Sequence, residues 1–137
     1  MHTVTTEPAV RVRGLRRVYG RGEAAVVALA GVDLDLAAGR WTSIMGPSGS
    51  GKSTLLQCAA GLDRADAGEV RLAGVELATA GETARTLLLR DRVGFVFQSY
   101  NLVEPLDVAT NVALPLLLAG RRRVRAEVDG ALAAVGL

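Results

Sequence analysis

The sequence predicts an α/β fold in which an antiparallel β layer precedes an incomplete parallel core. Three observations support this prediction. Apolar and polar residues alternate within 10–36, a glycine-rich segment at 46–51 separates a strand-like stretch from a helix-like one, and an apolar run fills 93–97. Alternation of period two is typical of half-buried strands, whereas an unbroken apolar run of strand length indicates a strand buried on both faces.

Length and composition indicate one soluble globular domain. The chain has 137 residues, of which 50% are hydrophobic and 22% charged, and this excludes a disordered tail or a disulfide scaffold. A single cysteine, Cys58, fits a reducing compartment. No signal peptide pattern opens the chain, and the uncharged stretch 108–120 has 13 residues, short of the roughly 20 that span a bilayer. We expect a cytoplasmic protein that reaches a membrane only through a partner.

The basic residues do not predict a nucleic acid partner. The formal net charge is only +2, and Lys52 is the single lysine among sixteen cationic residues. Arg121–Arg123 and Arg125 could contact phosphates, but they begin a predicted helix with an apolar opposite face and no interleaved aromatic residues. We therefore interpret them as a solvated helix face.

The first half of the chain is predicted as strands, a loop and a helix. Val10, Val12 and Leu15 mark a first strand and residues 27–36 a second, followed by a turn at 37–40. Residues 41–45 are bulky and β-branched, which favours a short strand that runs straight into the glycines. A helix over 52–60 should end at Gly61, which suits a helix C-terminus.

The second half begins with a predicted hairpin over 69–77, with Gly74 near its bend. A helix over 83–92, the buried strand 93–97 and a loop over 99–105 follow. Pro115 should end or kink the next helix, 107–119, because proline lacks a backbone N–H. In the last helix one apolar stripe is expected, formed by Val124, Val128, Leu132 and Val135.

The glycine-rich segment fits the pattern Gly-x-x-x-x-Gly-Lys-Ser/Thr, which predicts a phosphate-binding loop. Its residues are Gly46, Pro47, Ser48, Gly49, Ser50, Gly51, Lys52 and Ser53, and Thr54 extends it. Glycines let successive backbone N–H groups converge on a polyphosphate, which also faces the positive end of the next helix. A glycine-rich turn that contains Lys-Ser by chance is the alternative, but the position between a strand and a helix favours a nucleotide site.

Two side chains of this motif have predicted roles toward a bound nucleotide. Lys52 would reach the β and γ phosphates as a compact point charge, and the hydroxyl of Ser53 would ligate Mg²⁺. Arginine would replace Lys52 poorly, because its planar guanidinium is larger and its N–H donors point in fixed directions.

With these residues in place, the chain resembles an ATP-binding subunit of an ABC transporter. Residues 46–54 resemble the Walker A segment of that family, 61–63 and 67–70 resemble the stretch after it, and 93–98 resemble its Q-loop strand. The resemblance runs from about Val10 to Leu137. Residues 94–98, 101–102 and 111–115 are most similar to the subgroup that contains lipoprotein-releasing and macrolide-exporting ATPases.

The resemblance implies two further site residues. Tyr19 would stack on the adenine of ATP, although a lone tyrosine can also be an ordinary packing residue. Gln98 would contact Mg²⁺ or the attacking water and link the nucleotide to a transmembrane partner, although it could also be a polar strand end without a ligand. A neutral amide can ligate a cation and orient water without titrating. With Lys52, Gln98 would form the catalytic part of the site, and Ser53 and Gln98 its metal ligands.

The resemblance also implies an organisation and partners. Residues 1–137 would be a partial ATP-binding domain, with a nucleotide-binding core at 10–98 and the start of a helical subdomain at 99–137. In the family, two such domains enclose two ATP molecules and drive transmembrane permease subunits, so the chain would lie at the inner face of the cell membrane. The signature segment, the Walker B strand, the catalytic glutamate and the switch histidine are not in this sequence. We therefore expect the 137 residues alone to hydrolyse ATP negligibly.

Three hypotheses of function remain at this point. The first is an ATPase subunit that couples ATP binding and hydrolysis to export or lipoprotein release. A phosphate-loop NTPase of another class, such as a small-molecule kinase or a GTPase, is the second, but the hairpin and Tyr19 argue against it. The third is a truncated, non-catalytic nucleotide-binding fragment.

Overall fold

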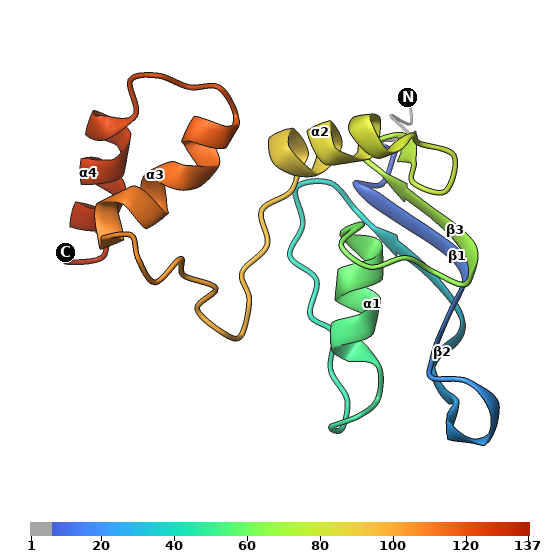
Figure 1. Cartoon of the computed structure of the whole chain (residues 1–137). Helices are drawn as coiled ribbons and strands as arrows, with labels where there is room; N and C mark the ends of the chain where they lie inside the picture. Colours follow the sequence, from blue (N-terminus) through green and yellow to red (C-terminus); the bar gives the residue numbers. More distant parts are fainter. Residues whose placement is uncertain (1–6) are drawn as a thin grey trace. The chain divides into compact units, whose positions relative to one another are not determined.

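The computed structural model describes residues 7–137, which divide into two compact units, one up to Arg92 and one from Val93 to Leu137. The first unit contains a four-stranded sheet of β1 (Val10–Tyr19), β2 (Val26–Leu36), β3 (Ala67–Leu72) and β4 (Val75–Glu76), in the order β2-β1-β3-β4 (Figure 1). All three pairings are antiparallel. The predicted antiparallel layer is therefore confirmed, with a short 3₁₀ turn, η1 (Gly22–Ala24), between its first two strands.

The sheet bends at a glycine in β1. The register of β1 shifts between Val12 and Leu15, and Gly14 there has a positive φ of 55°. The Gly14 N–H donates to the Asp33 carboxylate at 2.6 Å. Across the other pairing, a β-carbon on Gly68 would lie 2.5 Å from the Gly14 carbonyl oxygen. The strands cross so closely here that only glycine fits at Gly68.

A single helix, α1 (Lys52–Ala59), contacts β1, β2 and β3 and covers the core of the first unit. Val12 and Leu15 are fully buried in this core. Its other buried apolar residues are Leu29, Cys58, Ala59, Val70, Leu72 and Leu77. The helix ends as predicted: Gly61 has φ 76°, its N–H donates to Cys58 and the Leu62 N–H donates to Gln57. These are the two hydrogen bonds of a Schellman motif.

The hairpin and the helix after it also agree with the sequence. Ala73 and Gly74 connect β3 to β4 with φ values of 48° and 81°, the two positive values that a type I′ turn requires. Helix α2 (Glu82–Arg92) follows and closes the first unit.

Two predicted strands, at 41–45 and 93–97, are where the structure differs from the sequence prediction. Residues 41–45 and 93–97 are extended but form no strand, and within 7–137 the sheet contains only antiparallel pairs. Trp41 and Val96 are almost completely exposed. A strand needs a neighbour that accepts and donates its backbone hydrogen bonds and covers its side chains, and neither segment has one in the described chain.

The second unit is helical, with α3 (Val108–Leu118) and α4 (Arg125–Ala134) in contact (Figure 1). The Asp107 carboxylate caps α3 by accepting from the Thr110 N–H at 2.7 Å. Pro115 does not end α3, which continues for three residues beyond it. Of the predicted stripe, Val124 and Val128 are buried, Leu132 is half-buried and Val135 is exposed beyond the end of α4.

Arg121–Arg123 and Arg125 are all exposed, as expected for a solvated face, although the first three precede α4. Arg121 pairs with Glu127, and Arg125 with Asp129. Between residues 7 and 137, the structure contains no helix with the length and apolar character needed to cross a membrane.

Candidate phosphate-binding site

The predicted phosphate loop is an exposed turn that leads directly into α1. Its central and last glycines, Gly49 and Gly51, have φ values of 79° and 84°, a conformation that residues with a side chain rarely adopt. The Ser50 N–H donates to the Pro47 carbonyl at 3.3 Å and closes the turn. The glycines of the motif therefore shape a tight loop, as the sequence predicts.

The last glycine of the loop lies against strand β2. A β-carbon on Gly51 would be 2.4 Å from the Ala28 carbonyl oxygen and 3.2 Å from a methyl group of Leu29. The first of these contacts is with backbone, which cannot turn aside as a side chain can. Gly51 thus fixes the start of α1 against the sheet.

The first backbone N–H groups of α1 have no side-chain partner among the described residues. Gly51 is the N-cap residue and no side chain caps the helix, whose first turn also contains no acidic residue. The first N–H groups of a helix have no partner within it, and they carry the positive end of the helix dipole. A phosphate group at this point would accept hydrogen bonds from those N–H groups.

Lys52 lies over the loop. Its ammonium donates to the Pro47 carbonyl at 2.6 Å and to the Ser50 hydroxyl at 3.3 Å. Both partners belong to the loop, so the positive charge stays beside the N-terminus of α1. Ser53 is exposed in the first turn of the helix and Thr54 is half-buried.

A divalent cation at this site would depend on the nucleotide for most of its ligands. Among residues 7–137, histidine, cysteine, aspartate and glutamate side chains form no cluster of three that could hold a metal ion. The exposed Ser53 hydroxyl fits the role of a single protein ligand, and phosphate oxygens complete the oxygen shell that Mg²⁺ prefers.

Tyr19 is the last residue of β1, at the end of the sheet near the loop. It pairs with Val26 of β2, two residues before Ala28, whose carbonyl contacts Gly51. The ring is 39% exposed, and the Arg17 guanidinium lies over it, 4.6 Å from the ring centroid. The Tyr19 hydroxyl donates to the Asp63 carboxylate at 2.8 Å.

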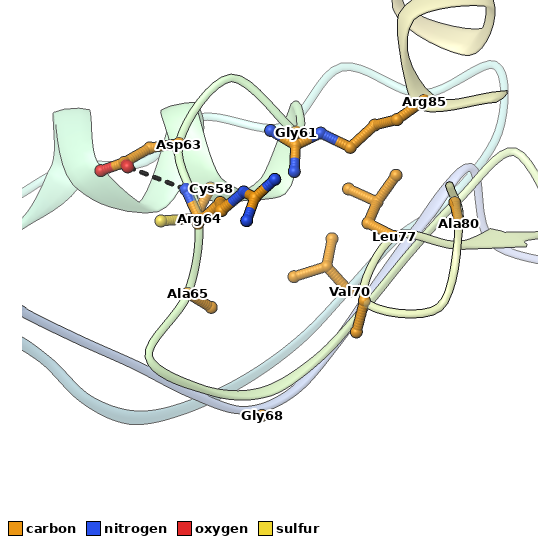
Figure 2. Close-up of a pocket in the computed structure, with 11 residues that line it drawn as sticks. Cys58, Gly61, Asp63, Arg64, Ala65, Gly68, Val70, Leu77, Ala80 and Arg85 are labelled. Carbon is orange, nitrogen blue, oxygen red and sulfur yellow. Dashed lines mark hydrogen bonds between the residues drawn. The ribbon is translucent and has the colours of Figure 1, made fainter. Parts of the chain in front are cut away.

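Asp63 and Arg17 are the residues that sequence reasoning missed. The Arg17 guanidinium donates to both oxygens of Asp63, at 3.0 and 2.9 Å, and the Arg64 N–H donates to the same carboxylate at 2.8 Å (Figure 2). Partial burial acts to raise the pKa of Asp63, but the hydrogen bonds from Tyr19 and Arg64 and the charge of Arg17 outweigh it and lower that pKa. Asp63 therefore stays a carboxylate at neutral pH.

A pocket of about 300 Å³ lies beyond the C-terminal end of α1, away from the phosphate loop. Arg64 and Arg85 line it, together with Cys58, Val70 and Leu77 (Figure 2). No residue of the loop lines this pocket, and residues 46–50 of the loop are exposed.

Gln98 lies in the second unit, on an exposed bend after the extended residues 93–97. In the segment before it, the rings of Phe95 and Phe97 pack 4.6 Å apart. In the first unit, Lys52 contacts the loop and Ser53 follows it in α1, whereas the Tyr19 hydroxyl contacts Asp63 in the turn after α1.

Comparison with known proteins gives one consistent family. The model of a family described as ABC transporter matches residues 29–137. The lipoprotein-releasing system ATP-binding protein LolD of Ruegeria sp. (strain TM1040) is 45% identical over 135 residues, which cover 96% of this chain and 60% of that protein. The macrolide export ATP-binding/permease protein MacB of Rhodopseudomonas palustris (strain BisB18) is 42% identical over 128 residues, 92% of this chain and 20% of that protein.

A solved structure also matches. The dimeric structure of a post-hydrolysis state of the ATP-binding cassette MJ0796 bound to ADP and Pi has a TM-score of 0.76 and 38% sequence identity. The match covers 83% of this chain and 48% of that one. The chain thus spans less than two thirds of the length of each of these three relatives.

Proposed function

Because this chain belongs to the ABC transporter family, we propose that it binds ATP with Mg²⁺ in the loop at 46–54 and acts as the ATP-binding part of a transporter. The observation that carries the proposal is the uncapped N-terminus of α1, which begins at Gly51 and has Lys52 beside it. Several convergent N–H donors and one ammonium suit a triphosphate, since hydrogen bonds to charged groups contribute about 1.5–3 kcal/mol each.

The proposed roles follow from the chemistry of each side chain. The Lys52 ammonium exchanges its loop carbonyl for the β and γ phosphates, and the Ser53 hydroxyl ligates Mg²⁺. The bound Mg²⁺ would neutralise part of the negative charge of the phosphates. Gln98 would ligate Mg²⁺ or orient water through its neutral amide, and Tyr19 would stack on adenine through its exposed face.

The proposed partners are transmembrane permease subunits and a second ATP-binding domain. The named relatives support this: one is an ATP-binding/permease protein for macrolide export, and the MJ0796 cassette is dimeric. In such an assembly the chain would lie at the inner face of the cell membrane and couple ATP binding and hydrolysis to export or lipoprotein release.

The test is calorimetric titration of the chain with Mg²⁺-ATP, for the wild type and for Lys52→Ala. Without the ammonium we expect affinity to fall by a factor of about 10–100, while thermal unfolding changes little because both partners of Lys52 are on the exposed loop. Arg64→Ala is the matched control: it removes one exposed cation beyond the far end of α1. Equal losses of affinity in both variants would overturn the proposed site.

A further inference from the structure

The Tyr19 side chain is held at two points, by Asp63 from the turn after α1 and by Arg17 of its own strand β1. Its hydroxyl donates to Asp63 at 2.8 Å, and one face of its ring lies against Arg17, which itself binds both oxygens of Asp63. One carboxylate thus holds both the hydroxyl and the cation that covers the ring.

The segment that carries Asp63 is anchored to the end of β1 independently. Asp66 accepts from the Val18 N–H at 2.6 Å and from Arg17 at 3.4 Å, and the Asp66 N–H donates to the Arg16 carbonyl at 2.9 Å. Asp66 makes no bond to Tyr19, so the two aspartates have different roles. Asp66 secures the strand, whereas Asp63 secures the ring.

An exposed tyrosine on a strand end would otherwise change rotamers freely. Ordering such a side chain on binding costs about 0.5–1.5 kcal/mol, a factor of about two to ten in affinity. A ring that is already fixed avoids this cost. The Arg17 cation lies over the ring, which is still 39% exposed.

We infer that Asp63 is a positioning residue for base recognition, which fixes Tyr19 through its hydroxyl and through Arg17 so that the exposed part of the ring meets the nucleotide base. The inference rests on the proposed function, because it requires Tyr19 to contact the base. The ionised state of Asp63 at neutral pH supports it, since a carboxylate accepts bonds from Tyr19, Arg17 and Arg64 at once.

The experiment separates base binding from phosphate binding. ADP and pyrophosphate are titrated in turn, each with Mg²⁺. The ratio of the ADP affinity to the pyrophosphate affinity measures what the nucleoside contributes. Tyr19→Phe keeps the ring and removes only the bond to Asp63, whereas Asp63→Asn weakens the acceptor without changing its size. For each we expect the ratio to fall about two- to tenfold, with pyrophosphate affinity unchanged.

Two further variants make the outcome decisive. Tyr19→Ala should lower the ratio about tenfold or more, as loss of aromatic stacking does. Asp66→Asn is the matched control, because Asp66 secures β1 and makes no bond to Tyr19, and its 3.4 Å contact with Arg17 is longer than the 3.0 and 2.9 Å bonds of Asp63. It should lower stability while keeping the wild-type ratio. In the double variant of Tyr19→Phe with Asp63→Asn, the ratio should fall no further than in the stronger single variant, because the bond that Tyr19→Phe removes is one of the contacts that Asp63→Asn already weakens.

Different results would overturn the base contact of Tyr19 and the positioning role of Asp63. An unchanged ratio in Tyr19→Ala would remove the base contact itself and with it the inference. A lowered ratio in Tyr19→Ala with wild-type ratios in Tyr19→Phe and Asp63→Asn would overturn the positioning role and leave the base contact standing. A ratio that falls as far in Asp66→Asn as in Asp63→Asn would also overturn it, by showing a general effect of β1. Should Asp63→Asn not fold, Tyr19→Phe decides alone.

Discussion

Gly51 meets the backbone of Ala28 so closely that a β-carbon on it would lie 2.4 Å from the Ala28 carbonyl oxygen. Gly51→Ala therefore adds a backbone collision to the cost of a left-handed conformation, which is about 1–2 kcal/mol by itself. We expect the variant to lower the free energy of unfolding by at least about 3 kcal/mol. Urea unfolding followed by circular dichroism measures it.

Gly49→Ala is the control for this prediction, because Gly49 has nearly the same φ, 79° against 84°, and nothing within 4 Å of a β-carbon. Gly49→Ala should lower the free energy of unfolding only by the cost of the left-handed conformation, about 1–2 kcal/mol. Equal losses in the two variants would show that the contact with Ala28 does not constrain the loop.

Lys52→Arg is expected to bind Mg²⁺-ATP about as poorly as Lys52→Ala. The ammonium reaches the Pro47 carbonyl at 2.6 Å and the Ser50 hydroxyl at 3.3 Å within one tight loop, a space that suits a compact charge and not a planar fork. The loss should be about tenfold or more in affinity by calorimetry. Wild-type affinity in Lys52→Arg would mean that only the sign of the charge matters.

The sequence was sufficient to predict the parts that depend on local pattern. The alternation within 10–36, the glycine at the bend of the hairpin and the helix that follows the loop each set their own backbone conformation, and the structure confirms them. The strands at 41–45 and 93–97 were predicted wrongly because bulky and apolar composition favours extended backbone but supplies no neighbour for its hydrogen bonds.

The contact between Asp63 and Tyr19 could not be predicted, because it joins residues 44 apart and no periodicity relates a turn after a helix to the end of a distant strand. Only the meeting of residues 63–66 with β1 brings them together. What the sequence does contain is two aspartates, Asp63 and Asp66, close together in one short turn and two adjacent arginines, Arg16 and Arg17, near the end of β1.

Part of the stability of the first unit should disappear in acid through Asp63. Its pKa in the folded chain lies below the usual value of about 3.9, so its stabilising effect is complete above that value and is lost as pH falls through the lowered pKa. Asp63→Asn lacks this titration. The difference in unfolding free energy between wild type and Asp63→Asn should therefore be large at pH 7 and smaller at pH 3, by urea unfolding; a constant difference would contradict it.

Cys58 should be nearly inert in the folded chain. Its side chain is 2% exposed in the core of the first unit, and burial, followed by the negative charge of Asp63, raises the pKa of its thiol. Because the thiolate is the reactive form, iodoacetamide at pH 8 should modify the native chain at least about 100-fold more slowly than the urea-unfolded chain. Cys58→Ser, which should incorporate no label, is the control. Equal rates would show that the core opens readily.

In the second unit, one amide side chain holds the loop before α3. The Asn111 oxygen accepts from the Val103 N–H at 2.8 Å, and its nitrogen donates to the carbonyls of Val103, Leu106 and Asp107 at 3.2, 3.0 and 3.0 Å. Asn111→Leu keeps the number and branching of the side-chain heavy atoms and makes none of these bonds. We expect this variant to lower the stability of the unit by about 1–3 kcal/mol.

Hydrogen exchange identifies this effect at a single amide. The Val103 N–H should lose its protection in Asn111→Leu, because the side-chain oxygen of Asn111 is its acceptor. The Thr110 N–H, which donates to Asp107 at the start of α3, should keep its protection, since the cap of the helix does not depend on Asn111. Protection of Val103 that survives in Asn111→Leu would show that the loop before α3 is held by something other than this side chain.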